Sequence, residues 1–387
     1  MQPPIPKVED YGMSATTGFL PPKPPLAHLY DPYYAPWESI IANLPHQISS
    51  KNIRSSIHTL LILSTTNLTT KAEYQRAFTL LTFLAHAYIW GERPPAERLP
   101  AGLSIPLLEV SEKLDIPPTI TYAALCLWNF RTQQGATLDD PANLQALHTF
   151  TATEDESWFY MISVAIEARG APIIPSLLAA IDATRKGDVP ALTTHLERVA
   201  EVLGQLAPLL RRMHERLSPQ IFYHDIRPFL AGSRSLPSGL VYGVGPATEE
   251  EGRVGRYGGG SAAQSSLFQL CDVVLGVQHG DAAAVVVKEM RELMPGAHRR
   301  FLEDVGAVAG VREFVEGNER EAGLAAAYRA CLEALKVFRN GHINVVTRYV
   351  VLPAKKEVKE GGEGEAKGTG GAPVIGFLKQ MRDETVG

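Results

Sequence analysis

One long helical run near the C-terminal end constrains the fold of this 387-residue chain more than any other feature. From Glu321 to Pro353 the sequence reads EAGLAAAYRACLEALKVFRNGHINVVTRYVVLP, and apolar side chains recur every three or four residues. This spacing is typical of an α-helix with one buried face, so the fold has to cover that face. The expected buried stripe consists of Leu324, Tyr328, Cys331, Leu335, Phe338, His342, Val345 and Tyr349.

The other apolar segments of the chain also have helical rather than strand periodicity. Examples are RAFTLLTFLAHAYIW (76–90), SIPLLEVSEKL (104–114) and TITYAALCLWNF (119–130), which are separated by proline-bearing breaks. Alternation with a period of two is nearly absent, so the predicted fold class is all-α. The polar segment RTQQGATLDDPANLQ after Phe130 predicts a division into a small N-terminal helical domain, residues 1–145, and a larger C-terminal helical domain, residues 146–387.

Two segments are not expected to be helical. The chain up to about Pro36 is rich in proline and aromatic residues, which favours an extended strap lying on a surface. The run LPAKKEVKEGGEGEAKGTGGAP, from Leu352 to Pro373, consists mainly of Lys, Glu and Gly and cannot bury apolar surface. It predicts a mobile loop over residues 354–372, followed by a short helix at VIGFLKQMR.

Composition and charge argue against several classes of partner. The net charge of −5 provides no positive field for nucleic acid or for an anionic membrane surface. The start of the chain, MQPPIPKVEDYG, lacks the pattern of a signal peptide, and no segment has the roughly 18 uninterrupted apolar residues of a membrane span. Cys126, Cys271 and Cys331 lie in apolar helical stretches without CxxC spacing, which argues against a disulfide framework or zinc site. We therefore expect a monomeric cytoplasmic protein with a small-molecule partner.

His342 interrupts the apolar stripe of the long helix and has two interpretations. A lone buried histidine is most often a core residue whose imidazole hydrogen-bonds a neighbour. The alternative is an axial haem ligand, for which two neighbours are hints. Gly341 costs the helix about 1 kcal/mol relative to alanine, which suggests that a flat group approaches closely. Arg339 lies one turn earlier, where it can pair with a carboxylate of such a group or remain a solvated surface arginine.

Two further motifs are candidates for ligand binding. In RYGGGSAAQSSLFQLCDVVLG, the glycines 258–260 precede an apolar helix, and free N–H groups at such a start can hold an anion. The competing interpretation is a flexible turn, since neither a dinucleotide nor a P-loop pattern is present. In SPQIFYHDIRPFL, Phe222, Tyr223 and Arg227 fall on neighbouring helical turns and suit a planar substrate with a carboxylate. Core aromatics and a surface arginine would give the same spacing.

The sequence resembles the indoleamine 2,3-dioxygenases, haem enzymes that open the indole ring of tryptophan. The resemblance extends over most of the chain, in the same order. It is carried by YIWGERPPAERLP, LDIPPTITYA, LPSGLVYGVG, GGGSAAQSSLFQLCDVVLG, MPGAHRRFLE, VREFV, GHINVVTRYVVLP and EAKGTGGAPVIGFLKQMR.

The resemblance implies an all-helical fold with haem b in the large domain, and it assigns roles to individual residues. His342 matches the proximal iron ligand, and Arg339 the arginine that pairs with a haem propionate. Arg227 matches the arginine that binds the substrate carboxylate. The remaining matches are the distal serine Ser163; the substrate-pocket residues Tyr122, Phe159, Phe222, Tyr223, Ala262 and Thr369; and Gly260 and Ser261 beside haem.

The implied reaction is insertion of O2 across the indole C2–C3 bond of L-tryptophan to give N-formylkynurenine, with ferrous iron maintained by an electron donor that the sequence does not identify. Tyr223 stands where the family commonly has phenylalanine, and Ala124 and Leu125 also depart from familiar vertebrate members. An alternative is a haem protein on the same scaffold that binds or senses O2 without oxidising tryptophan. A third reading is a helical interaction module with no cofactor.

Overall fold

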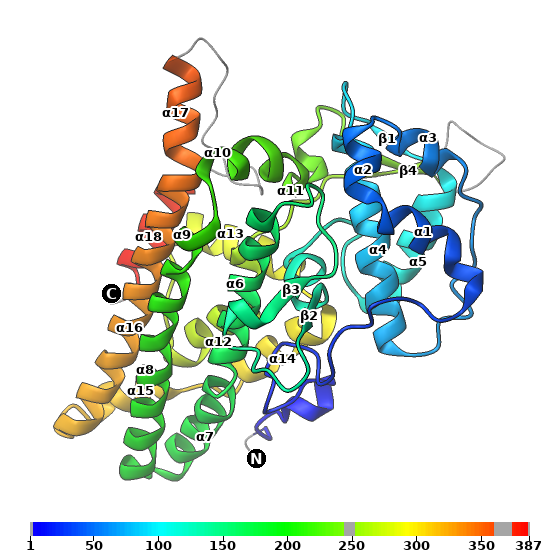
Figure 1. The fold of residues 1–387 in the computed structure, drawn as a ribbon. Helices are drawn as coiled ribbons and strands as arrows, with labels where there is room; N and C mark the ends of the chain where they lie inside the picture. Colours follow the sequence, from blue (N-terminus) through cyan, green and yellow to red (C-terminus); the bar gives the residue numbers. More distant parts are fainter. Residues whose placement is uncertain (1–2, 244–251, 360–373, 386–387) are drawn as a thin grey trace.

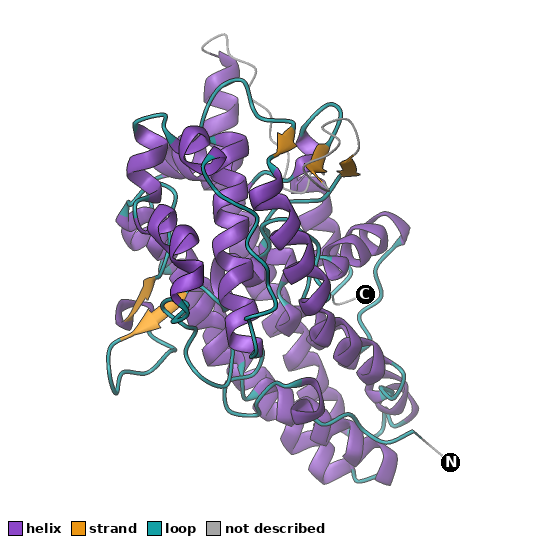
Figure 2. Cartoon of the chain, turned by 90° about the vertical axis from the view of Figure 1, so that its right-hand side faces the viewer, coloured by secondary structure: helices purple, strands orange, loops and turns teal. Residues whose placement is uncertain are grey.

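The computed structural model describes residues 3–243, 252–359 and 374–385. Helices dominate these residues, which confirms the predicted all-α class (Figures 1 and 2). The α-helices before residue 145 are α1 Ala35–Ala42, α2 Leu44–Ser49, α3 Ile53–His58, α4 Lys71–Trp90 and α5 Ala101–Leu114. Those after it are α6 Glu154–Gly170, α7 Ile173–Lys186, α8 Val189–Arg211, α9 Met213–Arg216, α10 Pro219–Ile221, α11 Arg227–Leu230, α12 Ser266–Leu275, α13 Asp281–Glu292, α14 Gly296–Gly306, α15 Val311–Gly317, α16 Ala322–Val346, α17 Leu352–Lys359 and α18 Val374–Asp383.

The remaining regular elements are short. The π-helical turns are η3 Ala123–Leu127, η5 Phe222–Ile226 and η8 Thr347–Val351. The 3-10 turns are η1 Val8–Tyr11, η2 Pro32–Tyr34, η4 Pro141–Asn143, η6 Ser233–Ser235 and η7 Ala262–Gln264. The strands are β1 Arg98–Leu99, β2 Phe130–Thr132, β3 Leu144–Ala146, β4 Leu240–Gly243 and β5 Gly252–Gly255. β4 pairs parallel with β1 and antiparallel with β5, and β2 pairs antiparallel with β3.

Side-chain caps fix the starts of α4 and α6, two long helices of the first half of the chain. α4 begins with a capping box, in which Thr70 Oγ1 accepts the N–H of Glu73 at 3.2 Å and the Glu73 carboxylate accepts the N–H of Thr70 at 2.8 Å. At the start of α6, Thr153 Oγ1 accepts the N–H of Glu156 at 3.2 Å. Both caps satisfy backbone donors that the helix itself leaves without partners.

The long helix predicted from Glu321 to Pro353 is confirmed and extends further. α16 continues through η8 into α17, and it packs along α8 (Figure 1). Every residue of the predicted stripe is buried except His342, which is partly exposed because its ring faces a cavity. The stripe therefore carries both the contact with α8 and one wall of the candidate site.

The first part of the N-terminal strap lies against the second half of the chain, and its end hydrogen-bonds the segment before α4, as Tyr34 does to the carbonyl of Ser64. The Tyr11 hydroxyl donates to Asp304 Oδ2 at 2.5 Å, and the rings of Phe19 and Phe301 lie 6.0 Å apart, so the strap packs on α14 (Figure 1). Helices α1–α5 gather on one side of the molecule, while α7, α8, α15 and α16 lie on the other. We retain the division near residue 145 as a proposal.

Two predicted segments differ in the structure. Within 119–130 only Ala123–Leu127 is helical, because the β-branched run Thr119–Thr121 follows two prolines and stays out of the helix. The start of the predicted loop is wrong, since Leu352–Lys359 forms α17. Its Lys and Glu residues are good helix formers, and a helix that continues a docked helix needs little apolar burial of its own. The rest of that predicted loop, residues 360–373, lies outside the described residues.

One helical stretch in the described residues is long and apolar enough to cross a bilayer by length and composition alone. It spans Glu154–Lys186, and 61% of its most apolar window is buried inside the protein. Such a stretch is weak evidence for a membrane span, because the core helix of a soluble protein passes the same test.

Candidate functional site

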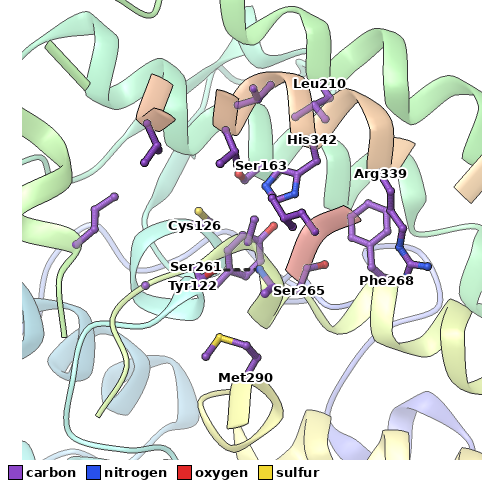
Figure 3. A pocket seen from close by; sticks show the side chains of 18 of the residues that line it. Tyr122, Cys126, Ser163, Leu210, Ser261, Ser265, Phe268, Met290, Arg339 and His342 are labelled. Carbon is purple, nitrogen blue, oxygen red and sulfur yellow. Dashed lines mark hydrogen bonds between the residues drawn. The ribbon is translucent and has the colours of Figure 1, made fainter. Parts of the chain in front are cut away.

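A largely apolar cavity of about 410 Å³ lies between α6, α12 and α16 (Figure 3). All three π-helical turns found in the described residues reach it. Leu125 and Cys126 come from η3, Phe222 from η5, and Tyr349 and Val350 from η8. π-Helical turns are rare and frequently occur at functional sites, and a large apolar cavity is the default candidate for a binding site. This cavity is therefore the candidate active site.

His342 projects from α16 into the cavity (Figure 3). Among the described residues, no hydrogen bond joins either of its ring nitrogens to another group. Burial lowers the pKa of His342 to about 4, so the imidazole is neutral near pH 7 and a nitrogen lone pair is available. The structure thus lacks the hydrogen bond that a purely structural core histidine is expected to make.

The glycine before this histidine is not required by the packing of the protein itself. A Cβ on Gly341 would lie 3.5 Å from Leu210 Cδ2, which is an ordinary van der Waals contact. Nothing in the described part of the chain therefore requires a glycine at this position.

Arg339 lies one turn before His342 and is held by a carboxylate. Its Nη2 donates to both oxygens of Asp272 on α12, at 2.6 and 2.7 Å. His279 approaches the same carboxylate at 3.2 Å and Glu384 at 3.2 Å, which extends the charge network to the C-terminal segment. Burial raises the pKa of Asp272, but Arg339 and His279 outweigh it and hold that pKa below its usual value. Asp272 is therefore an ionised, buried partner of Arg339.

Aromatic and arginine side chains are among the residues that line the cavity. The rings of Phe159 and Phe222 lie 4.8 Å apart, and Phe222 meets Tyr349 edge-on at 5.9 Å. The Arg227 guanidinium also lines the cavity and lies 5.3 Å from the centre of the Tyr223 ring. Aromatic rings of this kind can pack against a flat apolar group, and a guanidinium can pair with a carboxylate.

The glycine turn at residues 258–260 borders the cavity. Two of its glycines pack too closely against neighbouring elements to carry side chains. A Cβ on Gly259 would overlap the carbonyl of Leu230, and one on Gly260 would overlap the Leu125 side chain. Gln264 holds the turn by donating from Nε2 to the Gly259 carbonyl at 2.7 Å. The glycines therefore allow close packing of the backbone. This role differs from both interpretations of the sequence, an anion site and a flexible turn.

Comparisons with known proteins agree along nearly the whole chain. A family model described as indoleamine 2,3-dioxygenase matches residues 7–387. The chain belongs to the indoleamine 2,3-dioxygenase family. It is 38% identical to an indoleamine 2,3-dioxygenase of Penicillium citrinum over 98% of this chain and 88% of that protein. It is 39% identical to a 6-hydroxytryptophan 2,3-dioxygenase of Fusarium equiseti (98% and 97% covered) and 37% identical to an indoleamine 2,3-dioxygenase of Saccharomyces cerevisiae (99% and 94% covered).

Most residues that the resemblance assigned to the site of this oxidoreductase family meet in the one cavity. Tyr223 does not line it; its hydroxyl instead donates to Glu357 Oε2 on α17 at 3.1 Å. Thr369 lies outside the described residues. The assigned residues that do line the cavity are Tyr122, Phe159, Ser163, Phe222, Arg227, Gly260, Ser261, Ala262, Arg339 and His342.

Two acidic residues at or near the cavity were missed by sequence reasoning. Asp272 stands in the apolar stretch FQLCDVVLG, and Glu167 stands in MISVAIEARG. A carboxylate within an apolar helix signals a buried partner, because acidic side chains are almost never fully buried alone. The sequence carried that signal but not the identity of the partners, which come from other elements.

The residues at the cavity fit the haem that the family implies. The neutral His342 ring has no hydrogen-bond partner within residues 3–243, 252–359 and 374–385, which suits an axial ligand, and the apolar walls suit the faces of a porphyrin. The fit at Arg339 is less simple, because Asp272 already engages its guanidinium and places a negative charge beside it. A propionate would therefore have to share Arg339 with Asp272.

Proposed function

We propose that this chain is a haem b-dependent dioxygenase that inserts both atoms of O2 across the indole C2–C3 bond of L-tryptophan, giving N-formylkynurenine. The observation that carries the proposal is the His342 ring in a chain of this family: it is directed into an apolar cavity, and no residue that the structure describes hydrogen-bonds it. Because N-formylkynurenine is the product, the protein would act in the breakdown of tryptophan through kynurenine.

On the cofactor side, His342 would hold the iron through a neutral ring nitrogen, and Arg339 would meet a propionate. Gly260 and Ser261 would border the ring, since both line the cavity. When bound, ferrous haem supplies the iron that activates O2, and an external electron donor is needed to keep that iron reduced.

On the substrate side, Arg227 would bind the tryptophan carboxylate by a charge-assisted hydrogen bond. Phe159 and Phe222 would pack the indole ring, and Tyr122 and Ala262 would border it. Tyr223 would act indirectly, through its ring against Arg227. Holding the indole in one orientation beside the activated oxygen is the main contribution expected from the protein.

The cavity offers little general base, which agrees with a reaction that inserts two oxygen atoms and needs no strong base. Asp272 and Glu289 are the carboxylates that line its described part, and each is paired with an arginine. Burial raises the pKa values of Tyr122 and Cys126, so both are neutral near pH 7. Ser163 supplies a neutral hydroxyl that would touch the bound reactants.

The direct test is an assay of the purified protein with L-tryptophan. Reduced protein is mixed with L-tryptophan without oxygen, O2 is then admitted, and N-formylkynurenine is followed by its absorbance. We expect product to form only after O2 is admitted. A haem protein that binds O2 but leaves tryptophan intact would refute this function in favour of an oxygen-binding role, and a colourless protein would exclude both.

A further inference from the structure

Glu167 is a buried carboxylate on α6 that the proposed reaction does not use. It lies one helical turn after Ser163 and is fully shielded from solvent. Its Oε1 accepts hydrogen bonds from the Tyr122 hydroxyl at 3.0 Å and from the Ser265 hydroxyl at 2.6 Å. Its second oxygen, Oε2, is buried and has no hydrogen-bond partner among the described residues. Both donors line the cavity, whereas Glu167 lies behind them.

The two donors belong to different walls of the cavity. Tyr122 immediately precedes η3, and Ser265 is the residue directly before α12. Tyr122 is also held at its backbone, where its N–H donates to Gln264 Oε1 at 2.8 Å. Since Gln264 in turn holds the carbonyl of Gly259, these bonds join α6, the start of η3 and the glycine turn.

We propose that Glu167 is a positioning residue for the reaction: by accepting both hydroxyls on one oxygen, it holds the Tyr122 wall and the turn before α12 at a fixed separation. It thereby sets how tightly the cavity holds the indole. This inference rests on the proposed function, because its expected effect is on the binding of tryptophan. Glu167 itself does not line the cavity.

If Glu167 positions the cavity walls, its ionisation should make the KM for L-tryptophan depend on pH. A merely structural role would not produce this dependence. Burial raises its pKa to about 7, opposed by the hydrogen bonds from Ser265 and Tyr122. An ionised carboxylate is the stronger acceptor, so the two walls are held more firmly above pH 7 than below it. The other titratable groups that face this cluster are Tyr122, Cys126 and Cys271, whose pKa values burial raises, so none of them titrates near pH 7.

The test compares the haem-loaded wild type with Glu167→Leu and Glu167→Gln. Glu167→Leu removes the acceptor of both hydroxyls, and we expect the KM for L-tryptophan to rise roughly tenfold at pH 8, because part of the free energy of these two hydrogen bonds no longer holds the cavity walls together. We expect kcat to change by less than about threefold, because the reacting groups remain in place. The dissociation constant of L-tryptophan, from the shift that it causes in the haem absorption of oxygen-free protein, should rise by the same factor.

Glu167→Gln keeps an acceptor oxygen and cannot ionise, so the inference stays testable if the leucine variant fails to fold. The wild-type KM should fall as pH rises through about 7, and this change should be absent in Glu167→Gln. A matched control is Glu156→Gln, which alters another buried carboxylate of α6. Glu156 accepts from Phe150 N, Thr151 and Tyr160 and does not line the cavity, so this variant should keep the wild-type pH profile.

The outcomes separate the inference from the function on which it rests. Wild-type protein that forms no N-formylkynurenine refutes the function. Active wild type with an unchanged KM in Glu167→Leu, or with the same pH profile in Glu167→Gln, refutes the positioning role alone. Loss of the pH profile in Glu156→Gln as well would also overturn it, because the effect would then belong to α6 in general.

Discussion

His86 joins the two segments that carry Tyr122 and Arg227, and its substitution should weaken the fold in a pH-dependent way. The residue is buried in α4. Its Nε2 accepts the backbone N–H of Ile120 at 3.1 Å, so Nδ1 carries the proton and donates to the carbonyl of Phe229 at 2.8 Å. Ile120 lies two residues before Tyr122, and Phe229 lies two residues after Arg227.

The magnitude follows from the pKa of His86, which burial lowers from 6.5 to about 4. Protonating Nε2 would replace an acceptor by a donor facing the N–H of Ile120. The unfolded chain binds this proton below about pH 6.5, whereas the folded chain resists it until about pH 4. The contribution of the neutral imidazole to the free energy of unfolding is therefore present above pH 6.5 and is lost as pH falls toward 4. At 1.36 kcal/mol per pH unit it amounts to about 3 kcal/mol in total, of which about 2 kcal/mol is lost by pH 5.

The assay is urea unfolding of wild type and His86→Gln at pH 7.5 and pH 5, followed by circular dichroism. The variant cannot titrate at this position, so it should be less stable at pH 7.5, and the difference between the two proteins should shrink by about 2 kcal/mol at pH 5. His298, whose pKa burial lowers to about 3, is present in both proteins and cancels in the comparison. An equal difference at both pH values would refute the reasoning.

Two further substitutions test the substrate side of the cavity. Arg227→Ala removes a charge-assisted hydrogen bond of about 1.5–3 kcal/mol, so kcat/KM for L-tryptophan should fall roughly 10- to 150-fold while the Soret band persists; an unchanged kcat/KM would remove Arg227 from the site. Tyr223→Phe keeps the ring beside Arg227 and removes the bond to Glu357, so kcat/KM should stay within about twofold and the free energy of unfolding should fall by about 1 kcal/mol. A large loss of activity in this variant would mean that the hydroxyl itself touches the substrate.

The helices of this fold could be predicted from the sequence wherever they carry a long, periodic apolar face. The stripe from Leu324 to Tyr349 predicted the buried face of α16, and RAFTLLTFLAHAYIW predicted most of α4. The π-helical turns could not be predicted, because each depends on how a helix packs against residues distant in the sequence rather than on its own composition. The helical start of the predicted loop was missed because Lys and Glu were read for burial and not for helix propensity.

The candidate site could be predicted in part, and mainly through family resemblance. Periodicity placed His342 on a buried face but left its partner open, and the structure adds that no described residue hydrogen-bonds it. The pairing of Arg339 with Asp272, and the meeting of Tyr122 with Glu167, join elements far apart in the sequence. Such contacts follow from the packing of several helices and cannot be inferred from local spacing.

The absorption spectrum of purified His342→Ala tests the central claim most directly. Wild type should show a haem Soret band, and the variant should lose it at equal protein concentration because the proposed axial ligand is gone. His86→Gln, which alters a buried histidine outside the cavity, serves as the matched control and should keep the band. Full haem occupancy with an unchanged spectrum in His342→Ala would contradict the account.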